Sequence, residues 1–116
     1  MKREEKELLL KELCARLPYG VKLLHTPTNE ITNLEMIGNG VIDGNIHDLI
    51  ENFKPYLFPL SSMTAEQEIE CQQIKHSYYY DDDSFVLFDW YDKNHIDYRC
   101  LIPKGLANDA TGLNIY

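Results

Sequence analysis

The fold class is decided by the stretch VKLLHTPTNEITNLEMIGNGVIDGNI, residues 21–46. Short apolar runs are separated here by turn-forming residues, among them the Gly-Asn-Gly of 38–40, which accepts the positive φ angles of a tight turn. The pattern predicts three short strands, at 21–25, 32–37 and 40–42, arranged as an antiparallel meander.

A helix is expected before this meander, over about residues 3–17. Four residues at i, i+3, i+4 and i+7 spacing form its predicted apolar face: Leu10, Leu13, Cys14 and Leu17. Pro18 cannot continue a helix and Gly20 tolerates the exit turn, so the helix is expected to end there. This segment is therefore predicted to be an amphipathic helix that docks on the rest of the fold.

An extended segment is expected over residues 48–63. Pro55 and Pro59 push the residues before them away from helical backbone angles, which excludes a continuous helix. The segment is nevertheless too apolar for a solvated linker, since it contains Phe53, Tyr56, Leu57, Phe58 and Leu60. We expect it to cross the core as an edge strand or an extended stretch.

Two helices are expected after the extended segment. Thr64 and Gln67 match a capping box at the start of a helix over about 64–78. The predicted apolar stripe of that helix comprises Ala65, Ile69, Cys71, Ile74 and Tyr78. Spacing of four between apolar residues predicts a further helix over about 84–95, although its β-branched and aromatic residues leave a strand open for 84–94. The tail after Pro103 is expected to be irregular.

Strands grouped between helices predict an α+β fold in a single domain over residues 1–116. The expected order is an N-terminal helix, a small antiparallel three-stranded meander, and two C-terminal helices packed on it. The length of 116 residues is usual for one domain, and 44% hydrophobic with 26% charged residues is the composition of an ordinary globular protein.

The charge and the lengths of the apolar runs argue against two classes of partner, duplex nucleic acid and membranes. The net charge of −8 repels phosphates, so direct binding to duplex nucleic acid is not expected. Apolar runs such as residues 8–10 and 85–88 are far shorter than the ~20 residues that cross a bilayer, so no membrane partner is expected. The first residues do not resemble a secretory signal and the three cysteines form no C-x-x-C pair, which predicts a cytoplasmic protein.

The sequence predicts neither a cofactor nor a metal ion. It contains no phosphate-binding G-x-x-x-x-G-K-[ST], no G-x-G-x-x-G, no H-E-x-x-H and no G-x-S-x-G. The run Asp81-Asp82-Asp83 could suggest a divalent-cation site, but three consecutive carboxylates point in different directions. A solvated helix start, favoured by the positive end of the helix dipole, is the preferred interpretation.

The densest polar and aromatic stretch is DWYDKNHIDYR, residues 89–99. In an enzyme, His95 could act as a general base with Asp97 orienting it and Arg99 holding an anionic group. No nucleophile stands at a recognisable spacing from them. The preferred interpretation is structural: His95 is a cation near a helix C-terminus, Asp97 caps the next turn, and Arg99 pairs with an acid.

Aromatic residues gather in the same third of the chain. Phe and Trp are expected in the core, while tyrosines that cannot all be buried would leave an amphipathic surface suited to a partner. The candidate binding residues are Trp90, Tyr91 and Tyr98.

Two stretches resemble a family of small uncharacterised proteins encoded by gut-bacterial genomes, phages and mobile elements. KPYLFPLSSMT at 54–64 is similar to the family's KPYLRPMSSMT segment, and residues 89–107 are similar to its DWLNKNHFDYRGLIPMGLA segment. Together they cover about half of the chain. Phe58 replaces a common Arg and Cys100 a common Gly, so a ligand role of that Arg would not carry over. The resemblance implies an accessory role and brings no known activity.

Three functional hypotheses follow. The leading one is a small non-enzymatic interaction or regulatory accessory protein, of phage or mobile-element type, that binds a still unidentified protein partner. The second is a small enzyme that uses His95, Asp97 and Arg99. The third is an acidic mimic of nucleic acid that occupies a basic groove on another protein.

Overall fold

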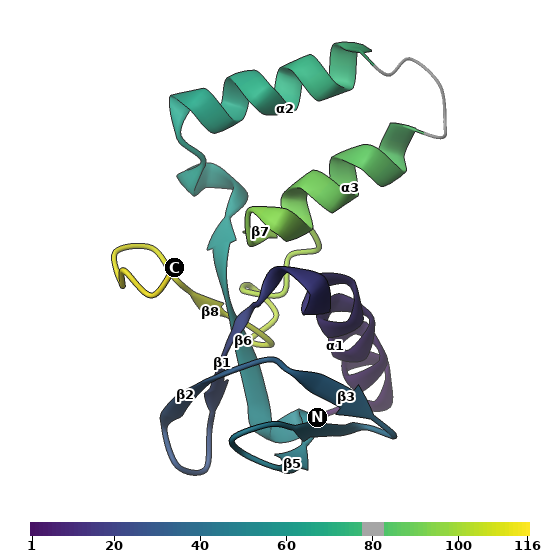
Figure 1. Ribbon diagram of the computed structural model, residues 1–116, viewed down its shortest axis with the longest axis vertical. Coiled ribbons are helices and arrows are strands. Elements are labelled where there is room, and N and C mark those ends of the chain that lie inside the picture. The colour runs from purple at the N-terminus through teal and green to yellow at the C-terminus, as the bar shows by residue number, and fades with distance from the viewer. Residues whose placement is uncertain (78–82) are drawn as a thin grey trace.

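The computed structural model describes residues 1–77 and 83–116 (Figure 1). The predicted α+β class is confirmed. An N-terminal helix, α1 (Arg3–Arg16), precedes a mixed sheet and a three-stranded antiparallel sheet, and two later helices follow, α2 (Ala65–Ser77) and α3 (Asp83–Lys93). The predicted helix at 84–94 is thus confirmed over its strand alternative. The aspartate run lies largely outside the described residues.

The mixed sheet is built around a long central strand, β6 (Phe53–Pro59). Its antiparallel partner is β1 (Lys22–His25), and its parallel partners are β7 (Ile96–Asp97) and β8 (Asn108–Asp109). The expected extended stretch is confirmed over Phe53–Pro59, whereas its edge-strand alternative is wrong, because β6 lies between β1 and β7. Among the described residues, β1 pairs with residues 53–55 whereas β7 and β8 pair with residues 56–59, so no single neighbour follows the whole strand.

The predicted meander divides between two sheets. The hairpin of β1 and β2 (Glu30–Asn33) belongs to the mixed sheet. The three-stranded antiparallel sheet consists of β3 (Met36–Gly38), β4 (Val41–Asp43) and β5 (Asp48–Leu49). The expected strand at 32–37 is broken where Leu34 turns into the core, with 4% of its surface exposed.

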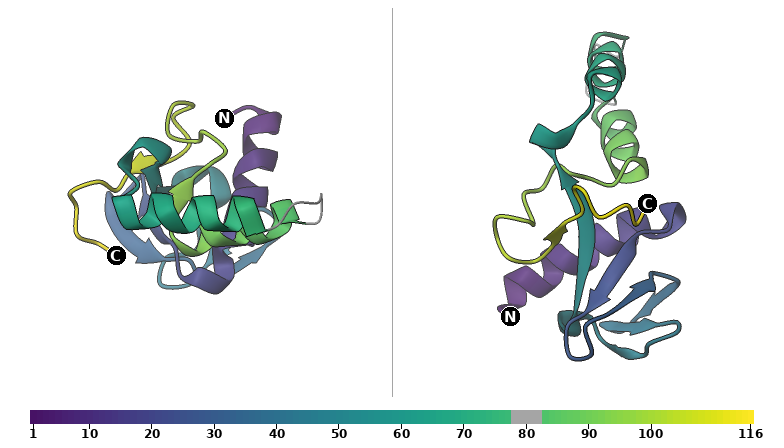
Figure 2. Two further views of the ribbon diagram at one scale, coloured as in Figure 1. Left: turned by 90° about the horizontal axis from the view of Figure 1, so that it is seen from above. Right: turned by 90° about the vertical axis from the view of Figure 1, so that its left-hand side faces the viewer.

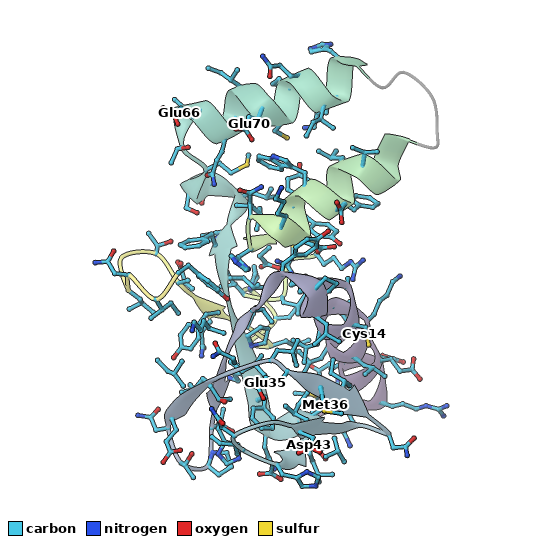
Figure 3. All side chains as sticks on the ribbon, viewed as in Figure 1. Cys14, Glu35, Met36, Asp43, Glu66 and Glu70 are labelled. Atoms are coloured by element: carbon cyan, nitrogen blue, oxygen red, sulfur yellow. The ribbon has the colours of Figure 1, made fainter. Side chains whose placement is uncertain are left out.

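The buried face of α1 differs from the predicted one. Leu10 and Cys14 are exposed, and Figure 3 shows Cys14 on α1. The buried residues of the helix are Leu9, Glu12, Leu13 and Arg16. The prediction counted only apolar side chains and so left out the buried pair of Glu12 and Arg16. The predicted face is therefore shifted by one residue from the observed one.

The described residues form two hydrophobic cores. The larger joins α1 to the sheets through buried residues that include Leu9, Leu13, Leu23, Phe53, Leu57 and Leu101. The smaller lies between α2, α3 and β7 around Cys71, Tyr91 and Ile96. The hairpin of α2 and α3 stands at the opposite end of the molecule from the three-stranded sheet, so the later helices do not cover that sheet (Figures 1 and 2).

The start of α2 follows the predicted capping box. The Thr64 amide donates to Oε1 of Gln67 over 3.0 Å, and the Gln67 amide donates to Oγ1 of Thr64 over 3.1 Å. The predicted apolar stripe holds for Cys71, which is buried in the smaller core, but is wrong for Ile69, which is 59% exposed. Tyr78, its last predicted member, lies outside the described residues. Within the described residues, no helix has the length and apolar character needed to cross a membrane.

Candidate functional site

The structure does not bring the three predicted catalytic side chains together. His95, Asp97 and Arg99 follow α3 along the strand β7 and the turn after it, and each contacts a different part of the fold. Among the described residues, no hydrogen bond or ion pair joins any two of these side chains.

Asp97 caps the turn that follows β7. Its Oδ1 accepts the amide of Leu101 over 2.8 Å, and its Oδ2 accepts the amide of Ile102 over 2.9 Å. The carboxylate is almost entirely buried, with 4% of the residue exposed. The structural interpretation of Asp97 is confirmed, because both of its oxygens are occupied by backbone.

Arg99 belongs to a buried charge cluster formed with Glu12, Arg16 and Asp92. Its Nη1 donates to Oε2 of Glu12 over 3.1 Å. Arg16 donates to the other Glu12 oxygen and to the carbonyl of Ile96, and its Nε lies 3.7 Å from Oδ1 of Asp92. The side chains of Glu12 and Arg16 are 0% exposed. The cluster therefore ties α1 to α3 and β7.

Unpaired polar atoms lie within this cluster and beside it. Within the described residues, the buried side-chain atoms without a hydrogen-bond partner include Nη1 of Arg16, Oδ1 of Asp92, the Tyr98 hydroxyl and Nδ1 of His95. The Tyr98 ring lies under both guanidinium groups, 5.6 Å from that of Arg16 and 5.0 Å from that of Arg99. Burial raises the pKa of Asp92, against the lowering effect of the Arg16 cation. The cluster and its surroundings therefore combine close ion pairs with buried polar atoms that the described residues leave without a hydrogen bond.

His95 has a left-handed backbone conformation, and its ring stacks on Tyr116. Its φ angle is 60°, and its ring stacks on that of Tyr116 with 3.8 Å between centroids. Burial, helped by the nearby Arg16 cation, lowers the pKa of His95 to about 4. The expectation of a cationic His95 at the helix end is therefore wrong, since desolvation outweighs the helix dipole and leaves the ring neutral at pH 7.

We expect replacement of His95 by asparagine to reduce the loss of folding stability that occurs when the pH is lowered. Asparagine tolerates the left-handed backbone and does not titrate. In the folded wild type the pKa of His95 is lowered to about 4. Between about pH 7 and about pH 5, the imidazole is therefore protonated in the unfolded chain only, and the free energy of unfolding of the wild type falls. Because the ring is partly exposed to solvent, the loss should be about 1 kcal/mol.

Urea denaturation at the two pH values measures this difference. Asp92 acts in the opposite direction, since a raised pKa in the fold adds stability as the pH falls, and it is common to both proteins. If the wild type and His95→Asn lost the same free energy of unfolding between the two pH values, the loss could not be assigned to protonation of His95.

The candidate binding aromatics form part of the smaller core. Tyr91 is 7% exposed and stacks on Tyr98 with 5.1 Å between centroids, while Trp90 meets Tyr91 edge to face. Nε1 of Trp90 donates to Oε2 of Glu70 over 3.0 Å, and Figure 3 shows Glu70 on α2. Tyr91 is therefore enclosed in the smaller core, whereas Trp90 and Tyr98 are partly buried, and a binding role for the three residues stays a prediction.

A second polar arrangement was missed at the level of sequence. His25 places Nδ1 2.7 Å from Oγ1 of Thr28 and Nε2 2.7 Å from Oδ2 of Asp48. The bond to His25 is the main cause that lowers the pKa of Asp48. With both ring nitrogens occupied and 5% of its surface exposed, His25 offers a substrate no free atom. The arrangement instead ties the β1–β2 turn to β5, and the sequence separation of 23 residues gave no signal of it.

The outer face of α2 is open to solvent. It contains a shallow hollow of about 540 Å³ lined by Ala65, Glu68, Ile69, Gln72, Gln73 and His76. These residues recur at helical spacing on the side opposite Cys71, which packs toward α3. Figure 1 shows α2 at one end of the molecule, above α3.

Within the described ranges, no group of three or more histidine, cysteine or acidic residues is placed to hold a metal ion. The resemblance of residues 54–64 and 89–107 to small proteins of gut-bacterial genomes stays a prediction, and function is inferred from the geometry. No protein-family model, no curated protein and no solved structure matches the chain.

Proposed function

We propose that this chain is a non-enzymatic interaction protein and that its contact surface is the outer face of α2. The single observation that carries the proposal is Ile69, which is 59% exposed within the hollow of about 540 Å³. Amphipathic helices commonly bind through such a face, with anchors at i, i+3, i+4 and i+7 spacing.

The way α2 is attached to the protein supports this proposal. Its inner side is fixed by Cys71, whose sulfur lies 3.5 Å from the Tyr91 hydroxyl, and by the bond between Glu70 and Trp90. The outer side is therefore presented on a helix held by the smaller core, which lowers the entropy lost on binding. The enzymatic alternative has weaker support, because His95 stacks on Tyr116 while Asp97 and Arg99 bond to other groups, so the three side chains do not converge.

We expect Ile69→Lys to weaken binding of a partner by at least about tenfold while the protein stays folded, since a central exposed aliphatic anchor is lost. Affinity-tagged protein, incubated with bacterial lysate, measures this as loss of the captured species. The matched control is Ile31→Lys, because Ile31 is 51% exposed but lies on β2, in a different part of the fold. Capture that is equally strong with both variants would contradict the proposal, as would capture of nothing by the wild type.

A further inference from the structure

The side chain of Tyr116 lies against residues from three other parts of the chain. Its hydroxyl accepts the amide of Lys22 over 2.8 Å and donates to the carbonyl of Tyr56 over 2.7 Å. Its ring stacks on that of His95, with 3.8 Å between centroids and 14° between planes, and the Phe58 ring meets it at a tilt of 52°. The amide of Lys22, the carbonyl of Tyr56 and the rings of Phe58 and His95 together form a tyrosine niche.

The walls of the tyrosine niche are held together by bonds in which Tyr116 takes no part. Lys22 lies on β1, which pairs with β6, the strand that contains Tyr56 and Phe58. The amide of Phe58 donates to the carbonyl of His95 over 2.8 Å, which fixes the backbone of the fourth member. The niche is therefore expected to keep its shape when Tyr116 leaves it.

Tyr116 is also the main attachment of the segment over residues 112–116. Within the described residues, the hydrogen bonds of this segment are the two of the Tyr116 hydroxyl and one from the amide of Leu113 to the carbonyl of Ala110. Figure 1 shows the segment as part of a loop that extends beyond β8. Tyr116 itself is 42% exposed, so solvent reaches its ring. Segments with so few contacts open locally at low cost, and such opening leaves the niche free.

The chemistry of the tyrosine niche fits a phenol. A single side-chain oxygen that accepts from an amide and also donates to a carbonyl must be a hydroxyl, because an ammonium only donates and a carboxylate only accepts. The two rings favour an aromatic group, since stacked and tilted aromatic pairs attract each other beyond the effect of their buried area. A phenylalanine would fill the ring position but would leave the amide of Lys22 and the carbonyl of Tyr56 unpaired.

We propose that the tyrosine niche binds a tyrosine side chain of another polypeptide, and that Tyr116 closes it as an internal competitor. The choice of ligand follows from Tyr116, whose hydroxyl and ring both find partners there. A short flexible tether gives such a competitor an effective concentration in the millimolar range, so an external tyrosine binds the wild type with reduced apparent affinity. The inference goes beyond the proposed function, because no member of the niche lies on α2.

Removal of the internal competitor tests the inference. Tyr116→Ala is titrated with p-cresol, which has the ring and hydroxyl of a tyrosine side chain, and the Lys22 amide is followed by NMR. We expect a dissociation constant of about 0.1–3 mM, at least about fivefold tighter than for the wild type. Toluene, which lacks the hydroxyl, should bind at least about tenfold more weakly than p-cresol. N-acetyl-tyrosinamide, which carries the backbone of a peptide, should bind as p-cresol does.

Two further variants control this titration. Leu113→Ala changes the same segment at a residue that is 49% exposed and leaves the competitor in place, so it should bind p-cresol as the wild type does. His95→Asn, added to Tyr116→Ala, should weaken p-cresol binding about threefold or more, because the stacked ring is lost. Circular dichroism checks that each variant is folded.

Tyr116→Phe takes the place of Tyr116→Ala if the latter does not fold. It keeps the ring but loses both hydroxyl bonds, which weakens the competitor, so p-cresol should bind it more tightly than it binds the wild type. The inference is overturned if p-cresol binds the folded variant no more tightly than the wild type, or if toluene binds as well as p-cresol. Binding of p-cresol without N-acetyl-tyrosinamide would overturn a tyrosine side chain as the ligand.

Discussion

Replacement of Arg16 by leucine is expected to lower the free energy of unfolding by about 3–5 kcal/mol. The guanidinium is 0% exposed and binds both Glu12 and the carbonyl of Ile96. Without it, Asp92 loses its nearest cation and Glu12 keeps only Arg99. An uncompensated buried carboxylate is costly, whereas the leucine gains only the burial of its side chain. Urea denaturation followed by circular dichroism measures the loss.

Arg3→Leu is the matched control for this prediction, because it removes the same side chain from the same helix. The side chain of Arg3 is 92% exposed and pairs with Glu7, which is also exposed. Exposed pairs of this kind contribute about 0.5 kcal/mol or less. A loss at Arg16 no larger than the loss at Arg3 would contradict the assignment of α1 docking to the buried charge cluster.

The same cluster explains why sequence reasoning found the first helix but not its buried face. Glu12 and Arg16 stand four residues apart, as do Arg3 and Glu7, and although the order of the charges is reversed between the two pairs, that order does not tell which pair is buried. The distinction comes from Arg99 and Asp92, which reach α1 from the other end of the chain. Long-range partners of this kind decide which charges are buried, and local periodicity does not report them.

The sheets show a similar division. Turn-forming residues located the strands between 21 and 43, because glycine and asparagine accept positive φ angles, as Asn39 and Gly40 do. The central position of β6 was not predictable, since its parallel partners are two-residue strands that have no periodicity of their own. Strand order in this sheet is determined by contacts between residues 53–59 and the last third of the chain.

For residues 89–99, the preferred structural interpretation holds for Asp97, which caps the next turn, and for Arg99, which pairs with Glu12, whereas the cationic state expected for His95 is wrong. Residues 89–99 are rich in aromatic and charged side chains because they lie where the smaller core meets the buried charge cluster. A buried junction of this kind and an active site are both rich in aromatic and charged residues. Burial separates them here, since it leaves His95 neutral and encloses Tyr91, and burial cannot be read from spacing alone.

The sharpest test of that structural role is Asp97→Ala, which is expected to destabilise the protein by about 2–4 kcal/mol. The substitution leaves the amides of Leu101 and Ile102 without their acceptors, in a segment where Leu101 is 0% exposed. Asp97→Asn keeps one carbonyl oxygen, so about half of the loss should return. Thermal and urea denaturation of the three proteins measure these steps.

Asp109 provides a control for the kind of bond involved. Its Oδ1 accepts the amide of Thr111 over 2.8 Å, as Asp97 accepts that of Leu101, but Asp109 is exposed and water can replace the carboxylate. We therefore expect Asp109→Ala to cost about 1 kcal/mol or less. If Asp97→Ala cost no more than that, the carboxylate would not be needed to close the turn, and a role in chemistry would become the better explanation for a buried acid two residues from His95. A loss several times larger than that of Asp109→Ala would instead account for Asp97 through the fold alone.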